Sequence, residues 1–260
     1  MKHTAKHKYI GLITVRTSSS RLPQKALQSI GSRSLIEHVI DRAKLSLEKG
    51  LSNIVLCTST EPADDVLEQI AKENNIDCFR GSNLDKIDRW RGAAEKFGAD
   101  YAITIDGDDP FCDPELVELA INQIEESSPD VITADNSAYV CGGFTHGIST
   151  KTLQAICEMK ASEDTEMTKP YLIESGKFSV AMLYVPEIFK GHKARLTLDY
   201  PEDLEFFRAV FQEMKMEKNI APLRDILEFL NSHPEIMDIN LFRQGDFVAN
   251  QKKAEKLELK

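Results

Sequence analysis

The 260-residue sequence predicts an α/β protein, in which helices cover both faces of a doubly wound, mostly parallel sheet. Apolar runs with the length of buried strands alternate with amphipathic helical patterns from residue 9 to residue 134. Helix-start signals fall between these runs, among them a capping box at Ser34 and Glu37 and a proline, Pro114, directly after Asp113. Hydrophobic residues make up 42% of the chain and charged residues 28%, a composition typical of a protein that buries a large core.

The first half of the chain is predicted to repeat a strand followed by a helix. Residues 9–15 form an apolar run typical of a strand buried on both faces of a parallel sheet. The capping box opens a helix whose apolar stripe ends at Gly50, and Gly98 stops a later helix. Further strands are predicted at residues 54–58, 76–79, 101–105 and 131–134, and further helices at residues 62–74, at 84–97 and after Asp113. Repeats of this kind require right-handed crossovers.

The second half of the chain does not continue this repeat of a strand followed by a helix. Between about residues 139 and 186 we expect two short helices and a strand, and we interpret this segment as a small inserted lobe because no linker flanks it. A strand at residues 195–198 then resumes the sheet, and an amphipathic helix follows at 201–216. Residues 217–260 form a predicted C-terminal helical extension. Together with the sheet and the inserted lobe, it is predicted to belong to a single domain, residues 1–260.

The charge balance and the cysteines limit the classes of partner. The net charge is -10 and the pI is about 5.2, which gives no support to a nucleic-acid-binding surface. No apolar run reaches the length of about 18 residues that a membrane-spanning helix needs. Residues 1–8 are polar and basic, and the apolar stretch after them is too short for a signal peptide. The five cysteines are scattered, so we expect a cytoplasmic protein without disulfides.

Three loops that follow predicted strands carry candidate functional residues, because ligands bind at the carboxyl ends of strands in an open parallel sheet. The first loop, residues 16–25, places Arg16, Arg21 and Lys25 around a run of serines that includes Ser18 and Ser19. Charge-assisted hydrogen bonds from these cations, with backbone amides of the serine run, could neutralise a triphosphate. A solvated polar loop is the alternative interpretation.

Carboxylates dominate the other two loops. Residues 106–110 bring three of them directly after an apolar strand, and Mg²⁺ binds one or two carboxylates together with phosphate oxygens. Asp108 is the strongest candidate ligand, because Gly107 beside it allows close backbone approach, whereas Asp113 is better explained as a helix cap. In the third loop, Asp199 ends a predicted strand directly before a helix, so its carboxylate could face Asp108 across a cleft.

Five segments together resemble the cytidylyltransferase family, which includes the spore-coat polysaccharide type and the CMP-Kdo and CMP-sialic acid synthetases. These segments are RTSSSRLPQKAL, IEHVIDR, RGSNLDKIDRW, GDDPFCDPEL and RLTLDYPEDLEF, in the family's order. The resemblance implies a sheet of the nucleotide-diphospho-sugar transferase type. It also implies Mg²⁺-dependent transfer of CMP from CTP to a sugar acid or related sugar-like acceptor, with release of pyrophosphate, in the synthesis of cell-surface polysaccharide or glycan.

The resemblance also implies roles for individual residues. Arg16, Arg21 and Lys25 occupy the basic positions of the loop that holds the triphosphate. Asp108 and Asp199 occupy the positions of the two carboxylates that hold the catalytic Mg²⁺. Catalysis would then consist mainly of positioning and charge neutralisation around the α-phosphate and the leaving pyrophosphate.

Fewer residues of the sequence point to contacts with the base and with the acceptor than to the phosphate and metal sites. Thr58 and Ser59 lie where relatives contact the base. His146 could contact the acceptor, although a lone histidine is more often structural, and Arg195 could pair with an acidic acceptor or simply lie on the surface. Relatives commonly dimerise, and the segment of about residues 139–186 contains apolar residues, so we expect a homodimer formed partly through it.

Two other function classes stay open at this stage. Asp106-Gly107-Asp108 matches the DxD pattern of a metal-dependent glycosyltransferase, although such an enzyme has less need of a basic triphosphate loop. Ser18 and Met167 depart from the family pattern and leave open a catalytically silent nucleotide-binding protein. Release of pyrophosphate would separate both alternatives from a nucleotidyltransferase.

Overall fold

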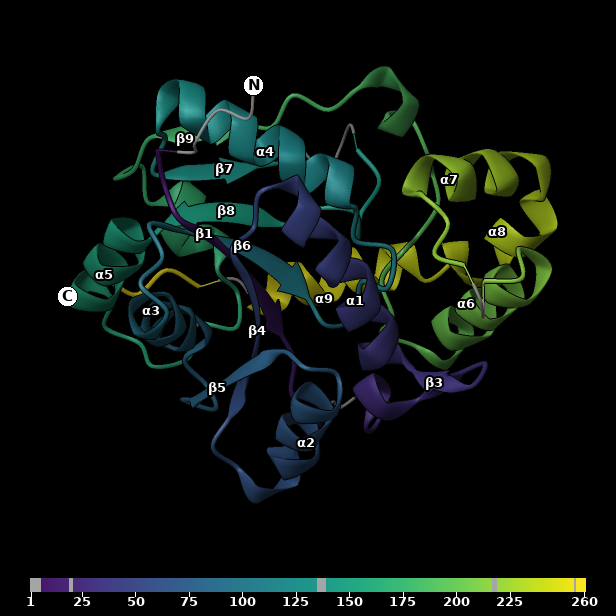
Figure 1. Ribbon diagram of the computed structural model, residues 1–260, viewed down its shortest axis with the longest axis horizontal. Helices are drawn as coiled ribbons and strands as arrows, with labels where there is room; N and C mark the ends of the chain where they lie inside the picture. The colour runs from purple at the N-terminus through teal and green to yellow at the C-terminus, as the bar shows by residue number, and fades with distance from the viewer. Residues whose placement is uncertain (1–5, 19–20, 135–138, 217–218, 255) are drawn as a thin grey trace.

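The computed structural model of the chain describes residues 6–18, 21–134, 139–216, 219–254 and 256–260 (Figure 1). Within these residues, one seven-stranded sheet has the strand order β5-β4-β1-β6-β8-β7-β9. Its strands are β1 (Tyr9–Thr14), β4 (Asn53–Ser59), β5 (Asp77–Gly81), β6 (Tyr101–Asp106), β7 (Val131–Thr133), β8 (His146–Ser149) and β9 (Val180–Met182). Only β8 runs antiparallel to its neighbours among these strands, which confirms the prediction of a mostly parallel sheet.

Helices cover both faces of the sheet, as predicted for a doubly wound fold. They are α1 (Leu35–Lys44), α2 (Asp65–Glu73), α3 (Lys86–Lys96), α4 (Pro114–Ser127), α5 (Thr150–Met159), α6 (Pro201–Glu213), α7 (Leu223–Ser232), α8 (Pro234–Leu241) and α9 (Gln244–Ala254). Side chains of β1 alternate between two cores. Tyr9 and Ile13 join the core that contains α1 and α4, whereas Ile10 and Leu12 join the core of α3 and α5. Helices α6, α7 and α8 lie together beside the sheet (Figure 1).

Helix starts follow the local signals of the sequence. The hydroxyl and backbone N–H of Ser34 both donate to Glu37 Oε2 (2.7 and 2.8 Å), so the predicted capping box is present. Asp113 Oδ1 accepts from the backbone N–H of Glu115 (2.8 Å), and Pro114 takes the first helical position of α4. These ends form where predicted because caps depend on residues only a few positions apart.

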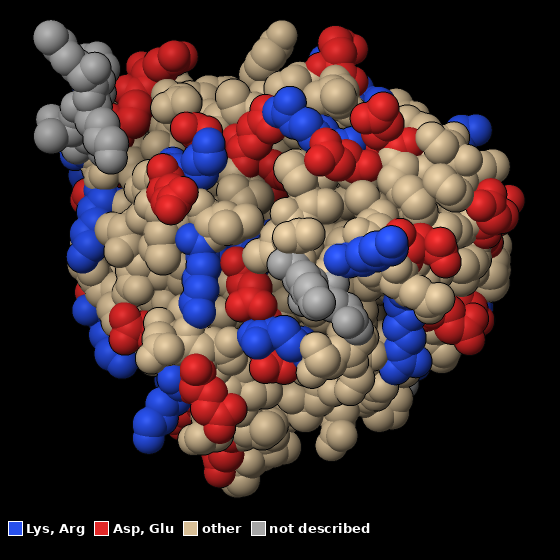
Figure 2. Space-filling view, turned by 45° about the vertical axis from the view of Figure 1, so that its right-hand side comes forward, with Lys and Arg blue, Asp and Glu red and all other residues tan. Residues whose placement is uncertain are grey.

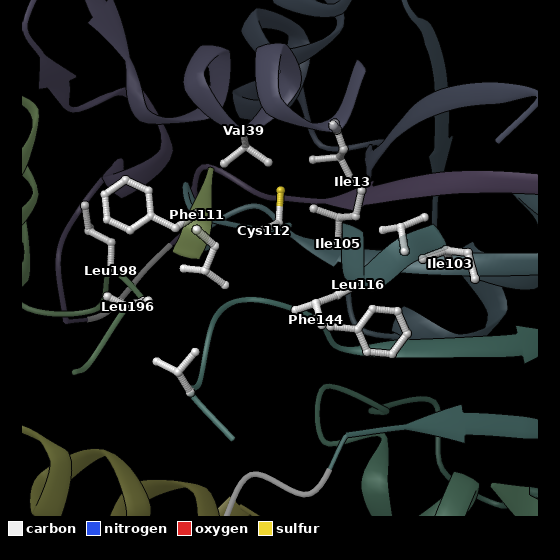
Figure 3. Close-up of a cluster of buried hydrophobic side chains, with 14 of the residues drawn as sticks. Ile13, Val39, Ile103, Ile105, Phe111, Cys112, Leu116, Phe144, Leu196 and Leu198 are labelled. Carbon is white, nitrogen blue, oxygen red and sulfur yellow. The ribbon is translucent and has the colours of Figure 1, made fainter. Parts of the chain in front are cut away.

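The predicted strand at residues 195–198 is wrong. This segment pairs with no described strand of the sheet, but the backbone N–H of Leu198 donates to the carbonyl oxygen of Asp108 (2.9 Å). Leu196 and Leu198 are fully buried, and Figure 3 shows both beside Phe111 in the cluster that also contains Ile13 and Ile105. A run of consecutive buried residues gives the same sequence pattern as a strand buried on both faces, without needing a strand partner.

The segment predicted as an inserted lobe, about residues 139–186, is part of the sheet instead. It supplies β8, which pairs with β6 and β7, and β9, which pairs with β7. It also contains α5 and a short helix at Pro170–Glu174, so the two short helices and the strand expected in this segment are present. Strand and helix patterns alternate less regularly in this segment, because β8 runs antiparallel to its neighbours and β9 has only three residues.

Candidate active site

Three segments meet at the carboxyl end of the sheet: the loop after β1, the loop after β6 and the segment that leads into α6. The hydrogen bond from Leu198 to Asp108 places Asp199 beside Asp108. Both carboxylates reach one ammonium group, because Lys25 Nζ donates to Asp108 Oδ2 (2.5 Å) and to Asp199 Oδ1 (3.0 Å). Arg21 adds a second cation at Asp199 Oδ1 (2.5 Å). The structure therefore brings together the four residues predicted as catalytic.

Burial and charge together set the ionisation of this carboxylate pair. Burial raises the pKa of Asp108, and the neighbouring carboxylates of Asp199 and Asp106 raise it further against the opposing effect of Lys25. Burial acts in the same direction on Asp199, but Lys25 and Arg21 outweigh it and lower the pKa of Asp199. Burial alone would lower the pKa of Lys25, yet the two carboxylates raise it. Asp199 is thus the carboxylate whose negative charge is better stabilised.

Arg195 is buried in contact with Asp199 and does not reach an open acceptor site. Its side chain is fully buried, and its guanidinium donates to Asp199 Oδ2 (3.0 Å) and to both oxygens of Asp203 (2.9 and 3.1 Å). Asp203 also accepts from the backbone N–H groups of Asp199 and Tyr200 (2.8 and 2.9 Å). This burial contradicts the prediction that Arg195 contacts an acceptor. Arg195 instead positions Asp199.

A second ion pair lies next to Asp108. Lys86, the first residue of α3, donates from Nζ to Asp106 Oδ1 (3.1 Å), and its ammonium lies 5.2 Å from the ring centroid of Trp90. Trp90 is fully buried, and its indole N–H donates to Thr14 Oγ1 (2.6 Å). Lys86 keeps Asp106 ionised, because its attraction outweighs burial and lowers the pKa of that carboxyl.

His146 begins β8 and faces the same polar region. Its Nδ1 lies 2.9 Å from Thr133 Oγ1. Burial lowers the pKa of His146 to about 4, against the opposing effect of Asp106, so the ring is neutral at pH 7. A neutral imidazole can donate or accept a hydrogen bond but cannot neutralise an acidic acceptor. The contact of His146 with an acceptor therefore stays a prediction, restricted to hydrogen bonding.

Arg16 and Ser18 of the basic loop lie in different environments. Arg16 is directed away from the carboxylate pair: it donates to the carbonyl of Asn83 (2.5 Å) and forms an ion pair with Glu166 (2.5 Å). Ser18 is exposed, whereas Ser19 lies outside the described residues. Arg16 thus has other partners than Arg21 and Lys25, although all three were predicted to bind the same triphosphate.

Asp64 explains the burial of Thr58 and Ser59. The hydroxyl groups of these two residues donate to Asp64 Oδ2 (3.0 and 2.5 Å), and both side chains are inaccessible to solvent. The other oxygen of Asp64 accepts from the backbone N–H (2.8 Å) and the hydroxyl (2.6 Å) of Thr17. The hydroxyls predicted to contact the base are therefore already engaged, and they serve to connect the end of β4 to the start of the basic loop.

Replacing Asp64 by Asn is expected to lower the free energy of unfolding by about 1–3 kcal/mol, since buried donors lose their acceptor. Burial works against ionisation of Asp64, but hydrogen bonds from Ser59, Thr17 and Thr58 lower its pKa. Its stabilising effect is therefore complete above the unfolded-state pKa of about 3.9 and is lost as the pH falls. Urea denaturation between neutral and acid pH should show the difference between wild type and variant shrinking toward low pH. A constant difference would contradict this role.

Three functional candidates were missed in the sequence: Asp64, Lys86 and Glu166. Asp64 lies at a helix start, where aspartate is common for electrostatic reasons, so its position gave no distinguishing signal. The only sequence signal for Lys86 was its place at the start of a helix that follows a strand end. Glu166 reaches Arg16 across 150 positions, and no local pattern indicates such a pairing.

The carboxylate pair fits the ligand preference of Mg²⁺. Asp108 and Asp199 direct hard oxygen ligands toward one cationic nitrogen, and Mg²⁺ is commonly bound by one or two carboxylates with substrate phosphates. In the part of the chain that the structure describes, no group of three or more His, Cys, Asp or Glu side chains could hold a metal ion. The remaining ligands would therefore have to come from phosphate and water.

Figure 2 shows Lys and Arg side chains interleaved with Asp and Glu side chains on the face it presents, without a broad basic area there. Across the described residues, none of the helices combines the length and the apolar character needed to cross a membrane.

Known proteins share both the sequence pattern and the fold. A family model described as cytidylyltransferase matches residues 10–221. The spore coat polysaccharide biosynthesis protein SpsF of Bacillus subtilis is 29% identical over 230 residues, which cover 86% of this chain and 94% of that protein. Among solved structures, a cytidylyltransferase from Leptospira borgpetersenii aligns with a TM-score of 0.80 and 27% identity, covering 88% of this chain and 96% of the other.

A more distant structure shares the fold. CMP:2-keto-3-deoxy-manno-octonic acid synthetase, solved in complex with CTP, aligns with a TM-score of 0.61 at 20% identity and covers 80% of this chain and 99% of the other. The family match favours nucleotidyl transfer over the glycosyltransferase that the Asp106-Gly107-Asp108 pattern also allowed. The chain belongs to the cytidylyltransferase family.

Proposed function

We propose that the protein is a Mg²⁺-dependent enzyme that transfers CMP from CTP to a sugar acid or related sugar-like acceptor and releases pyrophosphate. The observation that carries this proposal is the meeting of Asp108, Asp199, Lys25 and Arg21 at one point of the sheet edge. The CTP complex of the distant synthetase supports the choice of nucleotide. The name of the Bacillus relative supports a role in making cell-surface polysaccharide or glycan.

In the proposed reaction, an acceptor oxygen attacks the α-phosphorus of CTP. The bond from the α-phosphorus to the bridging oxygen breaks, and pyrophosphate leaves with the electron pair of that bond. Asp108 and Asp199 would hold Mg²⁺, which would supply Lewis-acid chemistry to the nucleotide phosphates. Lys25 and Arg21 would neutralise the charge that accumulates on the pyrophosphate, and the buried Arg195 would keep Asp199 in place.

The acceptor side of the proposed site is formed by the region around Asp106, Lys86 and His146. Lys86 is the charged group there that could attract an acidic acceptor, because His146 is neutral at pH 7. The proposed reaction consumes CTP, and the scattered free cysteines suit a reducing compartment, so we include a cytoplasmic location in the proposal.

In the presence of Mg²⁺, CTP is expected to bind more tightly than ATP or GTP. Isothermal titration calorimetry with each nucleotide measures this preference directly. A pyrophosphate-release screen of CTP against acidic sugars and sugar phosphates, followed by product mass, then identifies the acceptor. Tighter binding of a purine triphosphate would refute the CTP assignment, while the metal and phosphate sites would still stand.

We also propose a homodimer that forms partly through the segment of about residues 139–186. This segment ends the sheet with β9 and leaves Met182 and Tyr184 exposed by 51% and 73%, and Ile188 just beyond it is 50% exposed. Exposed apolar side chains beside a sheet edge favour association with another chain. Light scattering should give a dimer mass for the wild type and a lower mass for Tyr184→Lys combined with Ile188→Lys. A monomer mass for the wild type across a wide concentration range would contradict the proposal.

A further inference from the structure

The ammonium group of Lys25 lies where the two carboxylates of the proposed metal site meet. It is 2.5 Å from Asp108 Oδ2 and 3.0 Å from Asp199 Oδ1. We propose that Lys25, in addition to its role at the phosphates, acts as a resident counter-ion: it holds the two carboxylates together before substrate binds and competes with the divalent cation for them. This inference rests on the proposed function, because it requires Asp108 and Asp199 to be the metal ligands.

Competition follows from the burial of the contacts. The side chain of Asp199 is 1% exposed, and those of Lys25 and Asp108 are 18% and 23% exposed, so water can screen this cluster only weakly. A divalent ion bound to the same oxygens would be repelled strongly by an ammonium group in contact with them. Lys25 must therefore leave the carboxylates when the metal binds.

The local backbone allows the side chain to move while the main chain stays in place. Lys25 begins a short turn, Lys25–Leu27, which is closed by backbone hydrogen bonds from Leu27 to Gln24 (2.8 Å) and from Gln28 to Lys25 (3.1 Å). Ala26 in this turn is buried in the core. The four-carbon stem of lysine is flexible, and a triphosphate that arrives with the metal offers its ammonium a new set of oxygens.

Charges from the surrounding elements explain why Lys25 is the group that moves. Asp106, Asp108 and Asp199 supply negative charge around it, from β6, from the loop after β6 and from the segment before α6. Arg195 cannot leave, because Asp203 also binds its buried guanidinium. Arg21 contacts only Asp199 of the pair and is 36% exposed, so it does not bridge the two carboxylates.

The inference predicts opposite effects of one substitution on two ligands. In Lys25→Met, the affinity for Mn²⁺ without nucleotide is expected to rise by about tenfold, because the competing cation is gone. The affinity for Mg²⁺ with CTP is expected to fall, because the triphosphate loses its lysine. A residue that served only to stabilise the fold would weaken both.

Electron paramagnetic resonance of free Mn²⁺ gives the nucleotide-free affinity, and calorimetry gives the affinity for Mg²⁺ with CTP. Lys25→Arg retains a cation and should bind Mn²⁺ about as the wild type does. Lys49→Met removes the same charge from a surface pair with Glu118 and should leave both affinities unchanged. If Lys25→Met unfolds without metal, the thermal midpoint is followed against Mn²⁺ concentration, and a larger rise than in the wild type is expected.

Unchanged or weaker Mn²⁺ binding by Lys25→Met, measured with a wild type that binds Mg²⁺ and CTP, would overturn the counter-ion role alone. A wild type that binds no CTP, or Mn²⁺ binding that survives in Asp199→Asn, would instead refute the proposed function. The two failures are therefore distinguishable.

Discussion

Replacing Asp199 by Asn is expected to lower the turnover number by about 10²- to 10³-fold while the protein stays folded. The substitution keeps the shape of the side chain but removes the charge that faces Lys25 and Arg21. Folding should survive because Arg195 retains its ion pair with Asp203. Asp108→Asn is expected to behave similarly. Pyrophosphate release measures the turnover, and circular dichroism checks the fold.

The double variant tests whether the two carboxylates act as one site. If both bind one ion, the double variant should lose much less activity than the product of the two single losses. Glu202→Gln is the matched control, because Glu202 is a carboxylate close in sequence that pairs with Arg243 outside the cluster. Fully multiplicative losses, or near-wild-type activity of Asp199→Asn, would contradict the shared site.

Arg195→Met is expected to lower the free energy of unfolding by about 3–5 kcal/mol. The substitution leaves two fully buried carboxylates, Asp199 and Asp203, without their common cation. Urea denaturation measures this loss. The turnover number should fall as well, because Asp199 loses one of the groups that fix its orientation.

Arg243→Met provides the comparison for Arg195. Both guanidinium groups lie over the ring of Tyr200, at 5.5 Å for Arg195 and 5.1 Å for Arg243. Arg243 pairs with Glu202 where the side chains are 30% and 26% exposed, so its loss should change stability by less than about 1 kcal/mol. Equal losses in the two variants would show that burial of the ion pair does not determine its contribution.

The local parts of the fold could be predicted because their causes lie close together in the sequence. The apolar run of β1 and the cap at Asp113 each depend on neighbouring residues. The meeting of Asp108 and Asp199 was also predictable, although 91 positions separate them, because carboxyl ends of strands converge at one sheet edge. Here the prediction succeeded for a partly different reason, since the segment that leads to Asp199 is not a strand of the sheet.

Residues whose roles depend on distant partners could not be assigned. Whether Arg195 lies on the surface or in the core depends on how Asp203 and α8 pack. The sequence around Arg195 does not distinguish these two locations. Thr58 and Ser59 do end a strand, as predicted, but Asp64 turns their hydroxyls inward. The sequence can thus place a polar side chain near a site without showing whether it faces the ligand or supports a neighbour.

The position of β8 has a consequence for how the protein assembles during synthesis. The strands β5, β4, β1 and β6 all come from residues 9–106, so this part of the sheet can pair while the rest of the chain is still being translated. Among the described strands, β7 pairs only with β8 and β9, and it must wait for them before it can join. Asp199 is made later still. A nascent chain therefore completes its basic loop and Asp108 well before it has the second carboxylate. Because the proposed reaction needs both carboxylates, it could begin only after the segment leading into α6 has docked.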